Sequence, residues 1–177
     1  MKTPSALLKI HGIDTELLFW LNRHSRIRTI GFISRQISRL GDGPLYAAIG
    51  LMVWLWGGAA GAAFFYAGLA AYALELPLYW VLKNSIRRDR PKKGVRDLNA
   101  LITPSDKFSF PSGHTAAAFV FATLIAAFFP MFAPVAYVLA VFIGLSRIVL
   151  GVHYPSDIAA GAALGVLCGE TALYVMG

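Results

Sequence analysis

The apolar segments of this chain constrain its fold more than any other feature. Five runs carry almost no charge: 44–56, 59–82, 115–129, 135–145 and 158–176. A helix crosses a bilayer with roughly 20 mostly apolar residues, so some runs suffice alone and others need flanking residues. At 57% hydrophobic and 14% charged, the chain also lacks the polar residues that would cover a soluble core. We therefore predict an all-α fold: a polytopic membrane bundle with about five transmembrane helices.

Residues 1–43 have a different pattern. Over 17–43, apolar side chains mix with five arginines, as in amphipathic helices that lie in the headgroup region of a membrane. The alternative is a soluble basic tail. Polar residues interrupt the first apolar run and no small-residue cleavage site follows it, so we expect no cleavable signal peptide. The prediction is one domain over 1–177, with an interfacial segment at 1–43 and a transmembrane bundle at 44–177. The single cysteine, Cys168, excludes an internal disulfide.

The basic residues are unevenly distributed. Of 16 lysines and arginines, seven precede Gly43, eight lie from Lys83 to Lys107, and the last is Arg147. With five spans, all of these segments fall on one side of the membrane. Such a bias is typical of cytoplasmic loops and of contacts with anionic headgroups. Neither explanation accounts for the two histidines and the aspartate that lie at the membrane boundary on the same side.

The first motif that carries chemistry is KNSIRRDRP, residues 83–91. Lys83, Arg87 and Arg90 have the spacing of one helical face, and Pro91 ends the helix. Three neighbouring cations repel one another unless an anion lies between them, and phosphate suits arginine and lysine donors. The alternative is a solvated basic face.

The second motif is PSGH, residues 111–114. Ser112 and Gly113 lie where a loop becomes a helix, so we expect their backbone N–H groups to be unpaired and directed at an anion. His114 follows at the first turn and faces the same ligand. The alternative is an ordinary helix N-cap.

The third motif is SRIVLGVHYPSD, residues 146–157. His153 and Asp157 are four residues apart, so one helical turn would bring the carboxylate to the imidazole. That contact would fix the tautomer and leave Nε2 as a nucleophile. Arg147 can reach the same anion. An isolated interfacial histidine is usually structural, but the second histidine and the basic residues on this face favour a site.

The three motifs together resemble the type-2 phosphatidate phosphatase superfamily, which also includes vanadium-dependent haloperoxidases and acid phosphatases. The family signature is Lys-x6-Arg-Pro, then Pro-Ser-Gly-His, then Ser-Arg-x5-His-x3-Asp, and this chain meets every spacing from Lys83 to Asp157. The resemblance implies that His153 attacks phosphorus, that Asp157 orients it and that His114 protonates the leaving group. It also implies a set of phosphate-binding residues: Lys83, Arg90, Ser112, Gly113 and Arg147. Arg87 is an accessory candidate from helical spacing alone.

Glu75 lies in the middle of the apolar run 59–82, where an ionisable residue is costly and often functional. It either lines a substrate groove or is a protonated acid bonded to a neighbouring helix, which makes it a second accessory candidate. The acidic residues form no cluster typical of a Mg²⁺ site, so we expect no metal and no other cofactor.

The expected function is metal-independent hydrolysis of a lipid phosphate or prenyl diphosphate through a phosphohistidine. Alternatives are a vanadate-dependent haloperoxidase-like enzyme and an inactive phosphatase-like membrane binding protein. Candidate substrates are phosphatidate, phosphatidylglycerophosphate, undecaprenyl diphosphate and a lipid A phosphate, and no nucleic acid is expected. The expected location is the bacterial inner (plasma) membrane. The basic bias favours a cytoplasmic site, whereas the resemblance implies an extracytoplasmic one, and our prediction follows the resemblance.

Overall fold

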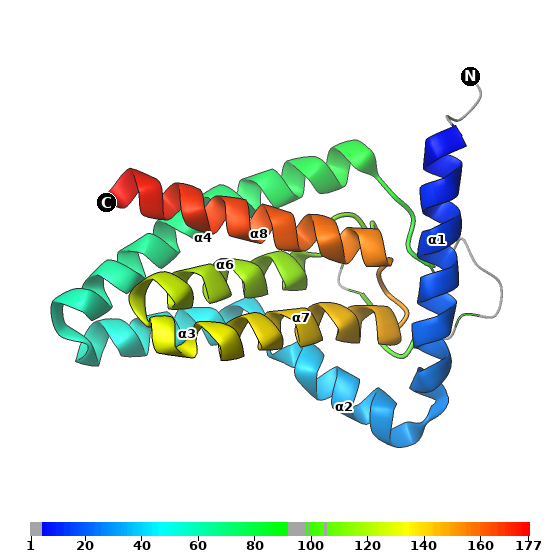
Figure 1. The fold of residues 1–177 in the computed structure, drawn as a ribbon, viewed down its shortest axis with the longest axis horizontal. Helices are drawn as coiled ribbons and strands as arrows, with labels where there is room; N and C mark the ends of the chain where they lie inside the picture. The colour runs from blue at the N-terminus through cyan, green and yellow to red at the C-terminus, as the bar shows by residue number, and fades with distance from the viewer. Residues whose placement is uncertain (1–4, 92–97, 99, 105) are drawn as a thin grey trace.

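The computed structural model of the protein describes residues 5–91, 98, 100–104 and 106–177 (Figure 1). Its elements are, in chain order, α1 Ser5–Asn22, η1 Arg23–Arg26, α2 Arg28–Arg39, α3 Gly43–Trp56, α4 Gly58–Ile86, α6 Gly113–Phe128, η2 Pro130–Phe132, α7 Ala133–Val149 and α8 Pro155–Met176. The prediction of an all-α fold is confirmed.

Each predicted apolar run forms a helix. By length and composition, three segments can cross a membrane unaided: Gly58–Ile86 with 29 residues, Pro130–Val149 with 20 and Pro155–Met176 with 22. Helices α3 and α6 are apolar but shorter, so not all five expected spans meet this length criterion. Large apolar side chains are exposed on the outside of the bundle, among them Trp56, Trp80 and Leu167. An exposed apolar surface of this kind suits a lipid environment, and the protein is a membrane protein.

The three motifs meet at one end of the bundle. Helices α4 and α7 end there and α3, α6 and α8 begin there, while the C-terminus lies at the opposite end (Figure 1). Helix α1 lies across this end rather than along the bundle (Figure 1). Some cations of the predicted one-sided set fall outside the described residues: Lys2, Lys92, Lys93 and Arg96.

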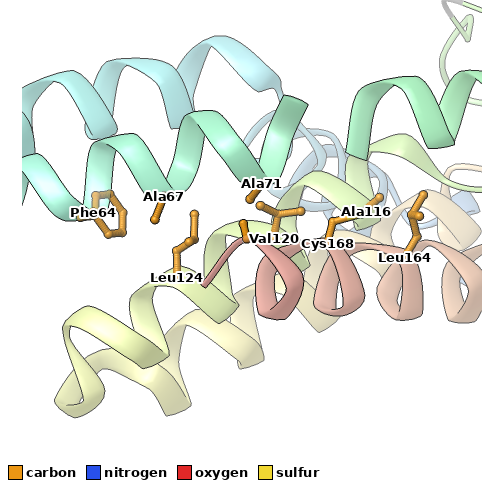
Figure 2. Close-up of a cluster of buried hydrophobic side chains, with 9 residues drawn as sticks. Phe64, Ala67, Ala71, Ala116, Val120, Leu124, Leu164 and Cys168 are labelled. Atoms are coloured by element: carbon orange, nitrogen blue, oxygen red, sulfur yellow. The ribbon is translucent and has the colours of Figure 1, made fainter. Parts of the chain in front are cut away.

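Helices α4, α6 and α8 pack around a core of mostly small side chains. Figure 2 shows Phe64, Ala67 and Ala71 of α4 opposite residues of α6 and α8. Glycines on α8 let its backbone approach α6 closely: a Cβ on Gly165 would lie 2.3 Å from the carbonyl oxygen of Ala116. This close packing brings the starts of α6 and α8, and with them two of the motifs, side by side.

Helix α2 is strongly amphipathic and packs against α7. Its small residues Gly31, Ser34 and Ser38 are buried, whereas Phe32 and Ile33 are exposed. Exposed apolar side chains beside arginines are typical of helices that insert one face into a membrane surface. The interfacial position of residues 1–43 stays a prediction.

Candidate active site

A cavity of about 870 Å³ lies at the end of the bundle where the three motifs meet. Helices α3, α4 and α6 form most of its wall, and the loops that carry Arg90, Asp106 and His153 close it. It gathers residues of all three motifs and one accessory candidate: Glu75, Lys83, Arg90, Gly113, His114, Arg147 and His153. Seven of the ten predicted site residues therefore line one cavity, whereas Arg87, Ser112 and Asp157 do not.

His153 lies in the loop before α8, with its side chain only 2% exposed. Its Nε2 is 3.3 Å from Nη1 of Arg90, and its Nδ1 is 3.5 Å from Oδ2 of Asp157. Because a guanidinium group only donates, the Nε2 atom carries the lone pair and the proton sits on Nδ1. Burial lowers the pKa of His153 to about 4, so the imidazole is neutral at pH 7. This is the protonation state in which Nε2 can attack phosphorus.

Asp157 is fully buried in the first turn of α8. Its Oδ2 accepts a hydrogen bond from the backbone N–H of Tyr154 at 2.9 Å. The predicted proximity of His153 and Asp157 is correct, but the expected helical pairing is wrong, because α8 begins only at Pro155. The pair is instead held by the helix-capping turn, in which Asp157 anchors the backbone next to His153.

Arg88 is a site residue that the sequence analysis missed. Its Nη1 donates to Asp157 Oδ1 at 2.9 Å and to Ser156 Oγ at 2.6 Å. Its Nη2 donates to Asp14 Oδ2 at 2.7 Å, and the guanidinium lies 4.0 Å above the ring of Tyr154. Arg88 thus connects α1 to the aspartate that faces His153, and it compensates the buried negative charge.

The predicted helical stripe of Lys83, Arg87 and Arg90 is wrong. Helix α4 ends at Ile86, and Arg87 adopts a left-handed conformation with φ 50°. A left-handed residue terminates a helix and redirects the chain. As a result Arg88 turns back toward the site, whereas the side chain of Arg87 is exposed and outside the cavity.

These contacts predict opposite behaviour for the two neighbouring arginines. We expect Arg88→Ala to lower kcat about tenfold to a hundredfold, because a hydrogen bond to a charged group contributes about 1.5–3 kcal/mol. Arg87→Ala is the matched control and should leave kcat nearly unchanged. Steady-state hydrolysis by the two purified variants checks this, and equal losses would show that Arg88 acts only through general surface charge.

Asp106 was also missed, although it lies between two of the predicted phosphate ligands. Its carboxylate accepts hydrogen bonds from Lys83 Nζ at 2.7 Å, from Tyr79 Oη at 2.7 Å and from Arg90. Partial burial by itself would raise the pKa of Asp106, but these donors hold it well below its usual range. A phosphate that binds Lys83 and Arg90 must therefore displace Asp106 or share these cations with it.

The segment before α3 contributes to the site as well. Nε2 of His114 is 3.0 Å from Oδ1 of Asp42, and Nη1 of Arg147 donates to Ser38 Oγ at 2.6 Å. The Nε of Arg147 is buried without a hydrogen-bond partner among the described residues. Residues 1–43, which carry no diagnostic motif, therefore supply Asp14, Ser38 and Asp42 to the surroundings of the catalytic candidates.

Ser112 does not present the free N–H group that the sequence suggested. Its N–H donates to the carbonyl of Asp157 at 3.0 Å, and its hydroxyl accepts from Thr115 as the N-cap of α6. The side chain is fully buried and does not line the cavity, so Ser112 connects α6 to α8. Gly113 does line the cavity, and a Cβ there would lie 2.9 Å from the ring of Tyr79.

The cavity extends along α4 toward the apolar part of the bundle. Leu51, Leu69 and Leu76 line it and are exposed by 44%, 54% and 59%. These residues lie on α3 and α4, so exposed apolar side chains of both helices border the cavity. Glu75 lies on this stretch of the wall, and its two predicted alternatives both stay predictions.

The fold and the site together define a class of protein: an all-helical membrane bundle with a buried histidine–aspartate pair among cationic side chains at one end. A sequence model of the PAP2 superfamily matches residues 60–177. The chain belongs to this superfamily, as the three motifs predicted.

Several relatives are named as phosphatases. The decaprenylphosphoryl-5-phosphoribose phosphatase of Mycobacterium tuberculosis is 42% identical over 89 residues, which cover 50% of this chain and 48% of the relative. Phosphatidylglycerophosphatase B of Bacillus subtilis is 36% identical over 110 residues, covering 56% and 51%. The crystal structure of Aquifex aeolicus LpxE matches with a TM-score of 0.80 at 28% identity, over 90% of this chain and 93% of that one. The chain spans about half the length of the two curated relatives.

Proposed function

We propose that this protein is a metal-independent phosphatase of membrane lipids that acts on a phosphate monoester or a diphosphate through a phosphohistidine. The observation that carries the proposal is the position of a neutral His153 beside Asp157, with Lys83, Arg90 and Arg147 lining the same cavity. Oriented cations next to a nucleophile suit phosphoryl transfer, in which negative charge spreads over the equatorial oxygens of the phosphoryl group. The phosphatase names of the relatives support the same reaction.

The proposed reaction has two steps. Nε2 of His153 attacks phosphorus, the bond from phosphorus to the leaving oxygen breaks, and His114 protonates that oxygen. Water then attacks the phosphohistidine, His114 takes a proton from it, and inorganic phosphate leaves with the N–P bond broken. The Nε2 atom can attack only after the guanidinium of Arg90 has moved away from its lone pair. An incoming phosphate draws this guanidinium toward the phosphate oxygens.

We predict that activity survives EDTA and that vanadate inhibits competitively. Three cationic side chains would supply the positive charge that a metal ion supplies in other phosphatases. Vanadate can adopt the trigonal-bipyramidal geometry of the transition state. Phosphate release by the purified protein, with and without chelator, checks this. Inactivation by EDTA with recovery on adding Mg²⁺ would contradict the metal-free mechanism.

The exposed apolar side chains of α3 and α4 that border the cavity support a lipid as the substrate. Phosphatidate, phosphatidylglycerophosphate, undecaprenyl diphosphate and a lipid A phosphate are the candidates to test, in a phosphate-release panel with the purified protein. Release from at least one lipid supports the proposal, whereas binding without release from any would favour the inactive binding protein. Halide oxidation in the presence of added vanadate would favour the haloperoxidase alternative.

We further propose that the site faces the extracytoplasmic side of a bacterial inner membrane. The C-terminus lies at the end of the bundle opposite the site (Figure 1), so its location reports the orientation. A fluorescent protein fused after Gly177 should therefore fluoresce in the cytoplasm, and alkaline phosphatase fused there should be inactive. The reverse pattern would place the site in the cytoplasm, as the positive-inside bias favours.

A further inference from the structure

Two buried polar groups face the apolar stretch of the cavity, away from the phosphate site. Glu75 of α4 is 2% exposed, and no hydrogen bond or ion pair joins it to any described residue. Tyr46 of α3 is 7% exposed, and its hydroxyl has no hydrogen-bond partner in the described part of the chain. Both side chains line the cavity, so α3 contributes a buried hydroxyl group without a partner and α4 contributes a carboxyl group.

Leaving such groups unpaired is costly. A buried hydroxyl or carboxyl group without a partner loses its hydration and gains nothing in return. Packing does not explain Tyr46, because its ring already stacks on Phe121 with centroids 4.8 Å apart, and phenylalanine would preserve that contact. Nearby, the hydroxyl of Tyr72 is satisfied by the carbonyl of Ala117 at 3.0 Å. Glu75 and Tyr46 therefore differ from Tyr72, the neighbouring residue of the same wall whose polar atom has a partner.

The distance of Glu75 from the phosphate site indicates which part of a ligand it meets. Glu75 precedes Lys83 by eight residues on the same helix, which corresponds to about 12 Å along the axis. Tyr79 lies between them and is already hydrogen-bonded to Lys83 and Asp106. A lipid can bind with its phosphate at Lys83. The part of that lipid between the phosphate and the hydrocarbon chain would then lie next to Glu75.

From these observations we infer that Glu75 and Tyr46 form a subsite for hydroxyl or amide groups located between the scissile phosphate and the hydrocarbon of the substrate. The subsite favours phosphorylated lipids with a sugar or polyol headgroup over prenyl phosphates. A hydroxyl or amide N–H donates to a carboxylate, and the tyrosine hydroxyl donates to an amide or hydroxyl oxygen. A prenyl chain has no such atoms and would leave both groups unpaired, which is how buried polar groups discriminate between ligands. The inference rests on the proposed phosphate site.

Binding of non-hydrolysable analogues tests the subsite without requiring turnover. The probes are two phosphonates of matched carbon number, one of an N-acylglucosamine lipid and one of a prenyl alcohol, titrated into the purified protein in detergent. We expect wild type to bind the glucosamine phosphonate at least tenfold more tightly. Glu75→Leu and Tyr46→Phe should each weaken its binding about tenfold, without weakening that of the prenyl phosphonate.

Two controls separate recognition from misfolding. Glu75→Gln keeps the size and a hydrogen-bonding group, so it should retain more of the preference than Glu75→Leu. Glu170→Gln alters an exposed glutamate of α8 outside the cavity and should change neither affinity. Equal affinity of wild type for both phosphonates, or equal weakening of both by Glu75→Leu, would overturn the subsite alone. Failure of wild type to bind either phosphonate would overturn the phosphate site and the subsite with it.

Discussion

His153→Ala is expected to abolish turnover, with kcat reduced by about 10⁴-fold or more, because the variant has no group that can form the covalent intermediate. Wild type incubated with ³²P-labelled substrate and quenched rapidly should yield a base-stable, acid-labile phosphoprotein, and the variant should yield none. His153 is buried, so His153→Gln, which fills more of the same space, is a second variant that should be equally inactive.

The pH dependence provides an independent check of the nucleophile. Because the pKa of His153 is lowered to about 4, the nucleophilic form is lost only as the pH falls through that value. The acid limb of kcat/KM should therefore have its midpoint nearer 4 than the ordinary histidine value of about 6.5. Turnover by His153→Ala at a rate near that of wild type would show that another residue attacks phosphorus.

Asp157→Asn is expected to reduce kcat by about 10³–10⁴-fold, by analogy with the aspartate of a serine-protease triad. All three neighbours of this carboxylate are donors: the guanidinium of Arg88, the N–H of Tyr154 and the Nδ1–H of His153. An amide has only one acceptor oxygen, so its NH₂ group must face a donor. His153 then loses the partner that keeps its proton on Nδ1.

The measurement for Asp157→Asn separates binding from catalysis. The affinity for vanadate should change far less than kcat, because the cations that line the cavity are intact. Glu16→Gln replaces an exposed carboxylate of α1 in the same way and is the control. A proportional loss of affinity and kcat would mean that Asp157 mainly maintains the fold.

The sequence predicted the catalytic candidates because each motif is local along the chain. Within the third motif, His153 and Asp157 are four residues apart, so a single turn is enough to bring them together. The same reasoning failed at Arg87, because it assumed a continuous helix to Arg90. One left-handed residue ends α4 and exchanges the roles of Arg87 and Arg88. Neither hydropathy nor spacing signals that conformation when the residue is not a glycine.

Hydropathy and motif spacing were thus sufficient for the helical membrane class, the superfamily and the set of candidate residues, since both depend on neighbours in sequence. The partners of those residues depend on tertiary packing. Arg88 meets Asp14 across 74 positions and His114 meets Asp42 across 72. The first pair forms because α1 crosses the end of the bundle, and the second because Gly41, where a Cβ would lie 3.1 Å from the Cβ of His114, lets the segment before α3 approach α6. A carboxylate on a distant segment has no local pattern that ties it to a given cation, and for that reason only the tertiary structure identified Asp14, Asp42 and Asp106.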